Sequence, residues 1–464
     1  MSSPTACDVL VIGSGPAGQK TAIAAVKAGR KVILVEQERA VGGACVHRGT
    51  IPSKTLRESA VRLTQLRRDE STRDALPPPG AEVASLMARL DHVVSAHAGY
   101  MGRQLDRNRV TVHHGRARFV TDRLIEVLSV TGERTRFAPE IVLVATGSRP
   151  RNPPEIPIDH ENILDSDSIL SMQYLPSSLT VLGGGVIASE YASIFAALGV
   201  RVTMIDKADR PLKFMDGDLV AKFVQAFERA GGTYIGEQGV RSAMFDGISR
   251  VATTLSNGQV IHSDKVLVAL GRAANVDDLN LEAAGLGANA RGVLPVDDHC
   301  RTAVPHIYAI GDVVGPPALA ATAMEQGRRA VGHALGLPDN SAANMIPIGI
   351  YTIPEMASVG ASEADAVKQF GSALIGRSRF DEVARGQISG ITDGLLKLVS
   401  DPTGRKLLGV HIVGEGATEL VHVGQMAMLG QMGIDAFVEN IFNFPTLAEA
   451  YRVAALDLVE RRPA

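Results

Sequence analysis

Two glycine-rich segments have the residue types and spacing with which a backbone turn binds the pyrophosphate of a dinucleotide. Each has two glycines, a small residue and, after the same interval, an acid: Gly13, Gly15, Gly18 and Glu36 in the first, and Gly183, Gly185, Ala188 and Asp206 in the second. The first glycine permits a tight turn, the second lets the backbone approach the pyrophosphate, the third residue lets a helix pack on a strand, and the acid binds a ribose. One such motif is weak evidence, but two at the same spacing predict two bound dinucleotides.

The elements that must position these turns repeat along the chain. Residues 8–36 and 178–206 align without a gap, and each segment runs from an apolar strand through the glycine turn and a small-residue helix to a second apolar strand. Such a βαβ unit builds a parallel sheet through a right-handed crossover. The amino terminus of the helix directs free N–H groups and the positive end of its dipole at the phosphates.

The rest of the chain is predicted to fit around these units. Residues 55–106 are expected to be helical, with a break at residues 77–80. The runs EIVLVATG (140–147) and DKVLVALG (264–271) read as buried strands that end in glycine turns, either beside a nucleotide where the chain crosses between domains or as plain strand ends. HIYAIGD (306–312) reads as a further strand before a helix from about Ala318. Asp312 is there either a ligand of a cofactor sugar or a turn residue.

Composition limits the classes of protein to consider. At 464 residues the chain suits about three domains, and beyond about residue 340 a mixed pattern without a nucleotide motif predicts the last. A net charge of −3 gives no field for nucleic acid or an acidic membrane, and no apolar run is long enough to cross a bilayer. The start lacks the features of a signal peptide. Cys7, Cys45 and Cys300 are too scattered for a disulfide framework or a zinc motif, so we expect no metal and a cytoplasmic protein.

The sequence resembles the flavoprotein disulfide reductases that bind two dinucleotides, such as dihydrolipoamide dehydrogenase and glutathione reductase. The resemblance spans almost the whole chain, and within the family it is greatest to the soluble pyridine nucleotide transhydrogenases. It rests on six motifs: GSGPAG (13–18), GGACVHRGTIPSK (42–54), ATG (145–147), GGGVIASE (183–190), YAIGD (308–312) and FPTLAEAY (444–451). It implies an α/β fold with two Rossmann-like domains and a C-terminal α+β dimerisation domain. The implied boundaries are 1–150 with 273–338 for FAD, 151–272 for NAD(P) and 339–464 for the interface.

The resemblance also assigns site residues. Glu36 would hold the adenosine ribose of FAD, Ala117 would lie by the adenine, and Asp312 would contact the ribityl chain. The implied FAD-binding residues are Gly13, Gly15, Gly18, Glu36, Gln37, Gly43, Cys45, Lys54, Ala117, Thr146, Gly147 and Asp312. Those implied for NAD(P) are Gly183, Gly185, Ala188, Glu190, Asp206, Lys207, Arg210 and Gly271.

The catalytic residues would be Lys54, near flavin N5 and paired with Glu190, together with Thr50. Without the resemblance, Lys54 would read as a solvated helix lysine and Glu190 as an exposed helix position. Cys45 is either a small filler residue of the turn or a reactive group. Thr50 either hydrogen-bonds near the flavin or simply packs there.

Two departures from the family pattern concern a single pathway. Of the redox-active cysteine pair of the disulfide reductases only the first member, Cys45, is present, because Thr50 stands in the second position. A disulfide needs two sulfurs, so none can form here. The histidine that moves protons to the thiols is replaced by Phe444, although Glu449 is retained. Electrons that enter from a nicotinamide must then leave through the nicotinamide pocket or to a diffusible acceptor.

The predicted reaction is therefore hydride transfer between NADPH and NAD⁺ in a ping-pong cycle through reduced FAD. The alternatives are a diaphorase that reduces quinones and a flavoprotein whose role is binding. Asp206 favours NAD, whereas Lys207 and Arg210 either offset the charge of a 2′-phosphate or are solvated loop residues. The family also implies a homodimer in which the segment around 444–449 reaches the partner's flavin.

Overall fold

The computed structural model describes residues 3–68, 81–338 and 345–463, which form two compact units. The first unit comprises Met1–Thr55, Ala84–Arg151 and Gly271–Ser341, and the second comprises Leu56–Val83, Asn152–Leu270 and Ala342–Ala464. Each unit is described by itself. The three-domain boundaries expected from the sequence stay a prediction.

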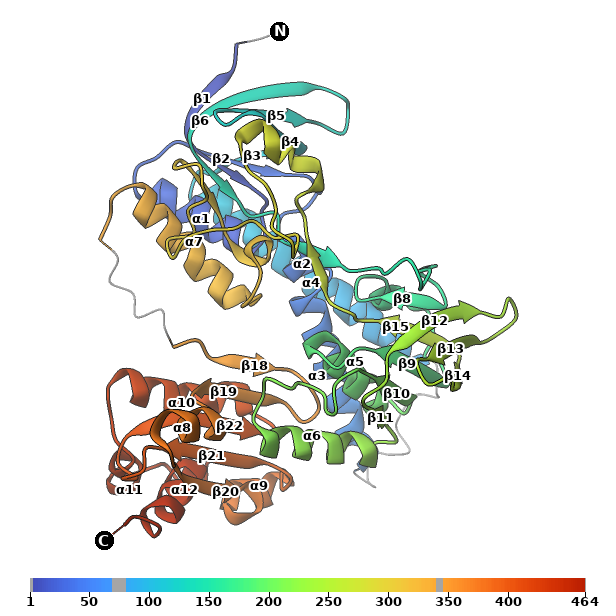
Figure 1. The fold of residues 1–464 in the computed structure, drawn as a ribbon, viewed down its shortest axis with the longest axis vertical. Coiled ribbons are helices and arrows are strands. Elements are labelled where there is room, and N and C mark those ends of the chain that lie inside the picture. Colours follow the sequence, from blue (N-terminus) through green and yellow to red (C-terminus); the bar gives the residue numbers. More distant parts are fainter. Residues whose placement is uncertain (1–2, 69–80, 339–344, 464) are drawn as a thin grey trace. The chain divides into compact units, whose positions relative to one another are not determined.

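The first unit is built on a seven-stranded sheet of order β3-β2-β1-β6-β5-β4, with β17 paired to β6 (Figure 1). Strands β1, β2, β3, β6 and β17 pair in parallel, whereas β4, β5 and β6 form an antiparallel meander. The strand bounds are β1 Thr5–Ile12, β2 Val32–Glu36, β3 Thr111–His114, β4 Arg116–Thr121, β5 Leu124–Leu128, β6 Arg134–Val144 and β17 Ile307–Ala309.

Helices cover this sheet and carry its turns. Helix α1 follows β1 directly and packs against α7. A small antiparallel pair, β7 with β16, lies where the chain leaves and re-enters the unit. The bounds are α1 Pro16–Lys27, α2 Gly43–His47, α4 Ala81–Arg107, α7 Ala320–Ala334, β7 Ser148–Pro150 and β16 Arg272–Ala274. Helix α3, Thr50–Arg68, begins in the first unit and belongs to the second from Leu56 onward. The prediction of helix between 55 and 106 is confirmed for the described part, and its break at 77–80 lies outside the described residues.

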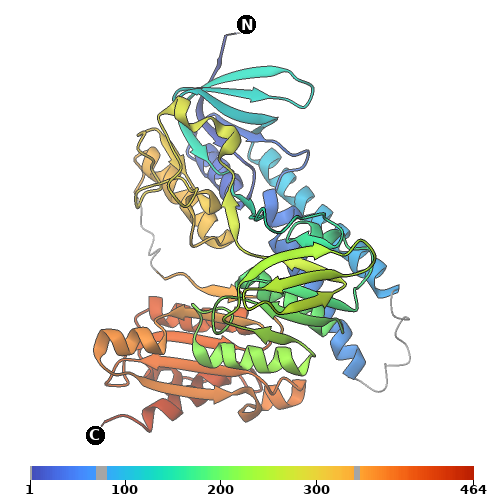
Figure 2. The same cartoon turned by 45° about the vertical axis from the view of Figure 1, so that its right-hand side comes forward.

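The second unit contains a five-stranded parallel sheet of order β11-β10-β9-β15-β8, which carries the second glycine turn between β9 and α5. A three-stranded antiparallel sheet, β12-β13-β14, adjoins it (Figure 2). The bounds are β8 Ile163–Asp165, β9 Ser178–Leu182, α5 Val186–Ala197, β10 Arg201–Ile205, α6 Gly217–Arg229, β11 Thr233–Ile235, β12 Val240–Phe245, β13 Val251–Leu255, β14 Val260–Ser263 and β15 Lys265–Val268.

The C-terminal part of the second unit is an antiparallel sheet of order β18-β19-β22-β21-β20, packed against α10 and α12. The bounds are β18 Ile348–Ile350, β19 Met356–Gly360, α8 Glu363–Phe370, β20 Leu374–Arg379, α9 Ala384–Ser389, β21 Leu395–Ser400, β22 Leu407–Val413, α10 Ala417–Leu429, α11 Asp435–Glu439 and α12 Glu449–Val459. The mixed strands and helices expected beyond about residue 340 are thus confirmed.

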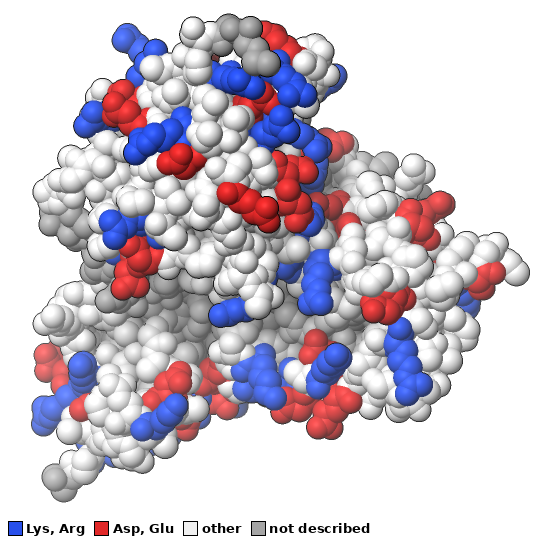
Figure 3. Space-filling model, turned by 45° about the horizontal axis from the view of Figure 1, so that its top comes forward, with Lys and Arg blue, Asp and Glu red and all other residues white. Residues whose placement is uncertain are grey.

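Three general features of the described residues bear on function: the surface charge, the apolar character of the helices and the state of the cysteines. On the face drawn in Figure 3, basic and acidic side chains are interspersed. Within residues 3–68, 81–338 and 345–463, no helix combines the length and apolar character needed to cross a membrane. All three cysteines lie in the described ranges and are unpaired.

Candidate functional site

The first glycine turn has steric requirements that match the roles expected of its residues. Gly13 has a φ of +103°, and a Cβ atom there would lie 2.4 Å from the carbonyl oxygen of Ala145. A Cβ on Gly18 would lie 1.8 Å from the carbonyl oxygen of Gly13, so only glycine allows α1 to pack this close to the turn. A Cβ on Gly15 would meet nothing within 4 Å, which leaves the middle of the turn open to a ligand.

The second turn repeats this geometry in the other unit. Gly183 has a φ of +115°, and a Cβ there would lie 2.5 Å from the carbonyl oxygen of Ala269. Gly185 again faces open space, and Ala188 is fully buried in the third position. Helices α1 and α5 begin after Gly15 and Gly185 without a side-chain cap, which leaves their amino termini to a ligand or to water.

The two acids bind their own turns. Glu36 Oε2 accepts hydrogen bonds from the Ser14 N–H at 2.9 Å and from the Ser14 hydroxyl at 2.5 Å. Asp206 Oδ2 accepts the Gly184 N–H at 2.6 Å, and its Oδ1 accepts the Ala208 N–H at 2.7 Å. Each carboxylate thus ties the end of its strand to the middle of the glycine turn. Ser14 was not among the predicted residues, although its place between two motif glycines was a usable signal.

A cavity of about 280 Å³ lies beside the Glu36 end of the first sheet and is lined in part by Gln37, Gly115 and Arg116. The Gly115 N–H donates to the Glu36 carbonyl at 2.9 Å, which joins this strand end to the start of β4. Ala117 is buried in that strand. The structure therefore brings together the residues assigned to the adenosine end of FAD, namely Glu36, Gln37 and Ala117.

The residues assigned to the flavin end of the first unit also gather. A Cβ on Gly43 would lie 2.9 Å from the Gly15 Cα, which places the start of α2 against the first turn. The Cys45 thiol lies beside the side chain of Thr50 and within electrostatic range of Lys54 and Asp312. Burial raises the pKa of Cys45, against the opposing effects of Thr50 and Lys54, so the thiol stays protonated at neutral pH.

Asp312, in the short 3-10 helix Gly311–Val314, is held by side chains that motif analysis missed. The Ser148 hydroxyl donates to Asp312 Oδ2 at 2.6 Å and accepts from Arg272 Nε at 2.7 Å. The hydroxyl of Thr146 is buried and has no hydrogen-bond partner among the residues that the structure describes. Gly147, which follows it, has a φ of +69°, as expected of a strand that ends in a glycine turn.

Lys54 and Glu190, the predicted catalytic pair, belong to different compact units, and their pairing stays a prediction. Lys54 Nζ donates to the Ser53 hydroxyl at 3.3 Å. Glu190 is only 4% exposed, and its Oε1 accepts the Tyr351 N–H at 2.9 Å. The plain reading of Glu190 as an exposed helix position is therefore wrong, because α5 is packed on all sides.

The loop after Asp206 holds its two basic residues differently. Lys207 is exposed and runs along Gly239, where a Cβ would lie 3.2 Å from Lys207 Cε. Arg210 is half-buried and reaches the carbonyl of Met215 at 3.5 Å. The Tyr234 hydroxyl, which no motif signalled, donates to the Ala208 carbonyl at 2.9 Å and fixes the loop. Burial and the Asp206 charge raise the pKa of Tyr234, so it remains a donor. Gly271, with a φ of +106°, follows the strand β15 segment and precedes β16.

Comparison with known proteins supports the family resemblance independently of the structure. Residues 7–327 match the family model described as pyridine nucleotide-disulphide oxidoreductase, and residues 346–455 match that family's dimerisation domain. The chain is 44% identical over 462 residues to a protein of Mycobacterium tuberculosis named soluble pyridine nucleotide transhydrogenase, covering 98% of this chain and 97% of the relative. A protein of the same name from Hahella chejuensis is 39% identical, with 98% of each chain covered.

Two solved structures are similar over nearly their whole length. LpdA from Mycobacterium tuberculosis has a TM-score of 0.89 at 26% identity, with 97% of this chain and 99% of that chain covered. The HOCl-induced flavoprotein disulfide reductase RclA from Escherichia coli has a TM-score of 0.87 at 25% identity, with 97% and 99% covered.

Proposed function

This chain belongs to the pyridine nucleotide-disulphide oxidoreductase family, and from this premise we propose that it is an FAD-dependent enzyme that transfers hydride between NADPH and NAD⁺. The relatives that cover nearly its full length carry the name soluble pyridine nucleotide transhydrogenase, which supports the proposal. The observation that carries it is the place of Thr50 beside the Cys45 thiol, because a hydroxyl stands where a second sulfur would be needed for disulfide chemistry.

The residues of the first unit fit an FAD molecule. The turn at Gly15 is open, α1 begins without a side-chain cap, and the Thr146 hydroxyl is buried without a hydrogen-bond partner among the described residues. Gly13, Gly15 and Gly18 would hold the pyrophosphate, Glu36 and Gln37 the adenosine, and Asp312 the ribityl chain. When bound, FAD supplies the acceptor and donor of the hydride.

The chain's own part in the reaction is to bind and orient. The second turn, with Gly183, Gly185 and Asp206, would hold the nicotinamide nucleotide in the same way. Lys54 would fix the position and charge of the isoalloxazine near N5, and Glu190, buried and bound to the Tyr351 N–H, would support it. Alignment of the reacting atoms supplies most of the rate enhancement in such a transfer.

The same proposal excludes electron transfer from the flavin through a redox-active pair of cysteine thiols. Cys45 is protonated at neutral pH because burial raises its pKa, and Phe444 has no proton to exchange. Phe444 is 69% exposed in the single chain, so a second copy of the chain could cover it.

We place the enzyme in a homodimer with one FAD per subunit. The family model for residues 346–455 is a dimerisation domain, and helix α10 presents exposed apolar side chains that a partner would bury. These are Val423, Met426 and Leu429, with Met432 and Ile441 nearby in sequence. The three unpaired cysteines suit a reducing compartment, and the cytoplasm is the proposed setting.

An anaerobic assay of the purified holoenzyme tests this function. NADPH is offered with thio-NAD⁺ in one reaction and with a quinone in another. Lipoamide and oxidised glutathione are offered in further reactions as disulfide substrates. Rapid thio-NAD⁺ reduction with parallel double-reciprocal plots is the expected result. Rapid quinone reduction alone would make the enzyme a diaphorase, turnover of a disulfide would refute the argument from Thr50, and no turnover at all would leave a binding protein.

A further inference from the structure

A polar cavity of about 260 Å³ lies at the edge of the second unit's parallel sheet that is opposite to its nucleotide turn. Ser178, Arg201 and Thr233, which line it, are the first residues of β9, β10 and β11. The glycine turn and Asp206 follow the carboxyl ends of β9 and β10, which lie a strand length away, about 16 Å at roughly 3.3 Å per residue. The cavity is therefore separate from the proposed NAD(P) site.

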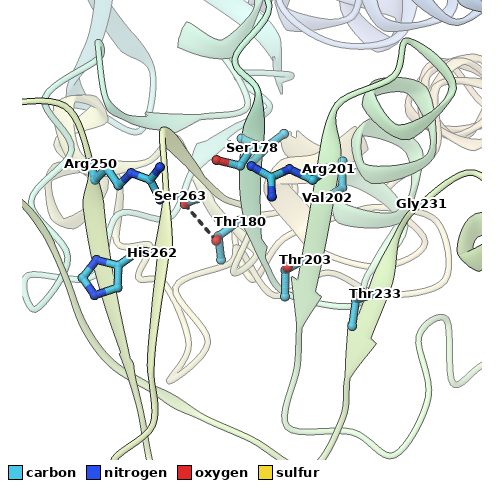
Figure 4. A pocket seen from close by; sticks show the side chains of 11 residues that line it. Ser178, Thr180, Arg201, Val202, Thr203, Gly231, Thr233, Arg250, His262 and Ser263 are labelled. Atoms are coloured by element: carbon cyan, nitrogen blue, oxygen red, sulfur yellow. Dashed lines mark hydrogen bonds between the residues drawn. The ribbon is translucent and has the colours of Figure 1, made fainter.

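Two arginines face this cavity from different elements. Arg201 begins β10, and Arg250 directly precedes β13. In Figure 4 their guanidinium groups extend toward each other from opposite sides of the pocket, with Thr180 and Ser263 between them in the view. Both arginines are exposed, and within the described part of the chain neither guanidinium group has a hydrogen-bond or ion-pair partner.

The remaining lining residues add donors. Thr203 and Thr233 contribute hydroxyl groups, and His262 contributes an imidazole that carries a charge when protonated. The Thr180 hydroxyl donates to Ser263 Oγ at 2.9 Å and helps to fix the floor of the cavity. Two acids lie next to lining residues: Asp246 accepts the Arg250 N–H at 3.0 Å, and Asp264 accepts the Ser177 N–H at 2.8 Å and the Ser178 hydroxyl at 3.0 Å. These bonds partly compensate the charges of both carboxylates.

We propose that the cavity between Arg201 and Arg250 is a binding site for a phosphate dianion, either inorganic phosphate or a small phosphate monoester. A planar guanidinium group matches the oxygen geometry of a phosphate, and two such groups line this one cavity. A volume of about 260 Å³ is too small for a dinucleotide, and the lining has no Phe, Tyr or Trp on which a base could stack. The size and the donors together indicate a compact phosphate.

Isothermal titration of the full-length holoenzyme in the presence of saturating NADP⁺ tests this site. Inorganic phosphate and glycerol phosphate are titrated at constant ionic strength, with potassium chloride as the blank. We expect saturable binding of at least one of the two, weakened about tenfold or more in Arg201→Gln and in Arg250→Gln. The tighter of the two probes identifies the source of the phosphate.

Arg241→Gln is the matched control, because Arg241 lies on β12 of the same unit but does not line the cavity. It should bind phosphate as the parent enzyme does. Melting temperatures of all the variants report on folding, and NADPH oxidation rates report on the proposed reaction separately. No saturable binding to the parent enzyme, or equal binding to the double variant of Arg201 and Arg250, would overturn the proposal whatever the outcome of the transhydrogenase assay.

Discussion

The carboxylate of Asp206 accepts the N–H of Gly184 at 2.6 Å, so the residue expected to select the nucleotide also holds the turn that would bind its pyrophosphate. Glu36 and Ser14 stand in the same relationship in the first unit at 2.9 Å. One side chain thus couples the two ends of each motif, the turn and the ribose position. Changes at the acid should consequently affect both the shape of the turn and the choice of nucleotide.

Replacing Asp206 by asparagine should shift the preference toward NADP(H). The amide keeps one oxygen for the Gly184 N–H but removes the negative charge that repels a 2′-phosphate. We expect KM for NAD⁺ to rise about tenfold, because the ribose hydroxyl loses its hydrogen bond to a charged acceptor, which costs about 1.5 kcal/mol. KM for NADPH should fall. Asp209→Asn, in the same loop but ion-paired with Lys213, is the control. Equal changes for both nucleotides would contradict this role.

The Gly13 turn should be essential for retaining the flavin. In Gly13→Ala the new methyl group would lie 2.4 Å from the Ala145 carbonyl oxygen, so the turn must move. Gly29→Ala is a matched control, because Gly29 also has a positive φ, +78°, but faces open space, and the expected cost is only about 1–2 kcal/mol. The ratio of flavin to protein absorbance after purification should fall strongly in the first variant and stay near the parent value in the second.

The sequence predicted the turns because their requirements are local. Periodic glycines and strand-ending acids place Gly13 in the first βαβ unit and Gly183 with Asp206 in the second, and the structure has all three where the pattern puts them. The burial of Glu190 also had a local signal, since α5 is apolar almost all round and such helices are buried. The expectation that Glu190 is exposed was wrong because it rested on the polarity of this one residue, whereas the apolar helix around it is buried.

Contacts between distant segments could not be read in this way. Ser148 binds Asp312 from 164 positions away, and Lys397 binds Asp216 from 181 positions away. Neither contact belongs to a motif, and each depends on how whole elements pack. Without an observed fold, Lys397 in particular would be placed on the surface, as lysines usually are.

A second sulfur beside Cys45 should be able to form the missing disulfide. The Cys45 and Thr50 side chains are neighbours, so the two thiols of a Thr50→Cys variant are expected to reach bonding distance. Thiol titration of the oxidised, unfolded variant should find two fewer free thiols than after reduction, whereas the three cysteines of the parent all remain free. Thr55→Cys, on another side of α3, should add a thiol and no disulfide. If Thr50→Cys keeps every thiol free, the assigned geometry of this turn is wrong.

A buried ion cluster should contribute strongly to the stability of the second unit. Lys397 is 2% exposed and binds Asp216 at 2.9 Å, Asp218 at 3.0 Å and Glu363 at 2.6 Å. Lys397→Met leaves the buried Asp216 carboxylate unpaired, which costs about 3 kcal/mol or more. The exposed pair Arg229–Asp393 is the control, and Arg229→Met should cost less than about 1 kcal/mol. Denaturant titrations that show similar losses for the two variants would refute the distinction.

The pH dependence of that cluster follows from its pKa shifts. Burial alone would lower the pKa of Lys397, but its bonds to Glu363, Asp216 and Asp218 raise it above the usual range. Burial alone would raise the pKa of Asp218, but Arg377 and Lys397 hold it below the usual range. A raised lysine pKa stabilises fully below the unfolded value of about 10.4, and a depressed aspartate pKa stabilises fully above about 3.9.

The difference in unfolding free energy between the parent and Lys397→Met should therefore be constant from about pH 5 to about pH 10. It should shrink as the pH rises through the folded pKa of Lys397, and again as the pH falls through that of Asp218. Unfolding curves at several pH values measure it directly. A difference that peaks at neutral pH and halves by pH 6 would point to a histidine instead.

The exposed apolar face of α10 should be the site at which two copies associate. Met426 is 58% exposed at the middle of this face, between Val423 and Leu429. Met426→Glu would bury a charge in the interface, and the cost of a few kcal/mol should weaken dimerisation about 100-fold. Sedimentation velocity across a dilution series should detect monomer in this variant and dimer in the parent. Ile248→Glu changes an 85% exposed residue outside this domain and should leave the dimer intact. If Met426→Glu sediments as the parent does, copies of the chain associate through another surface.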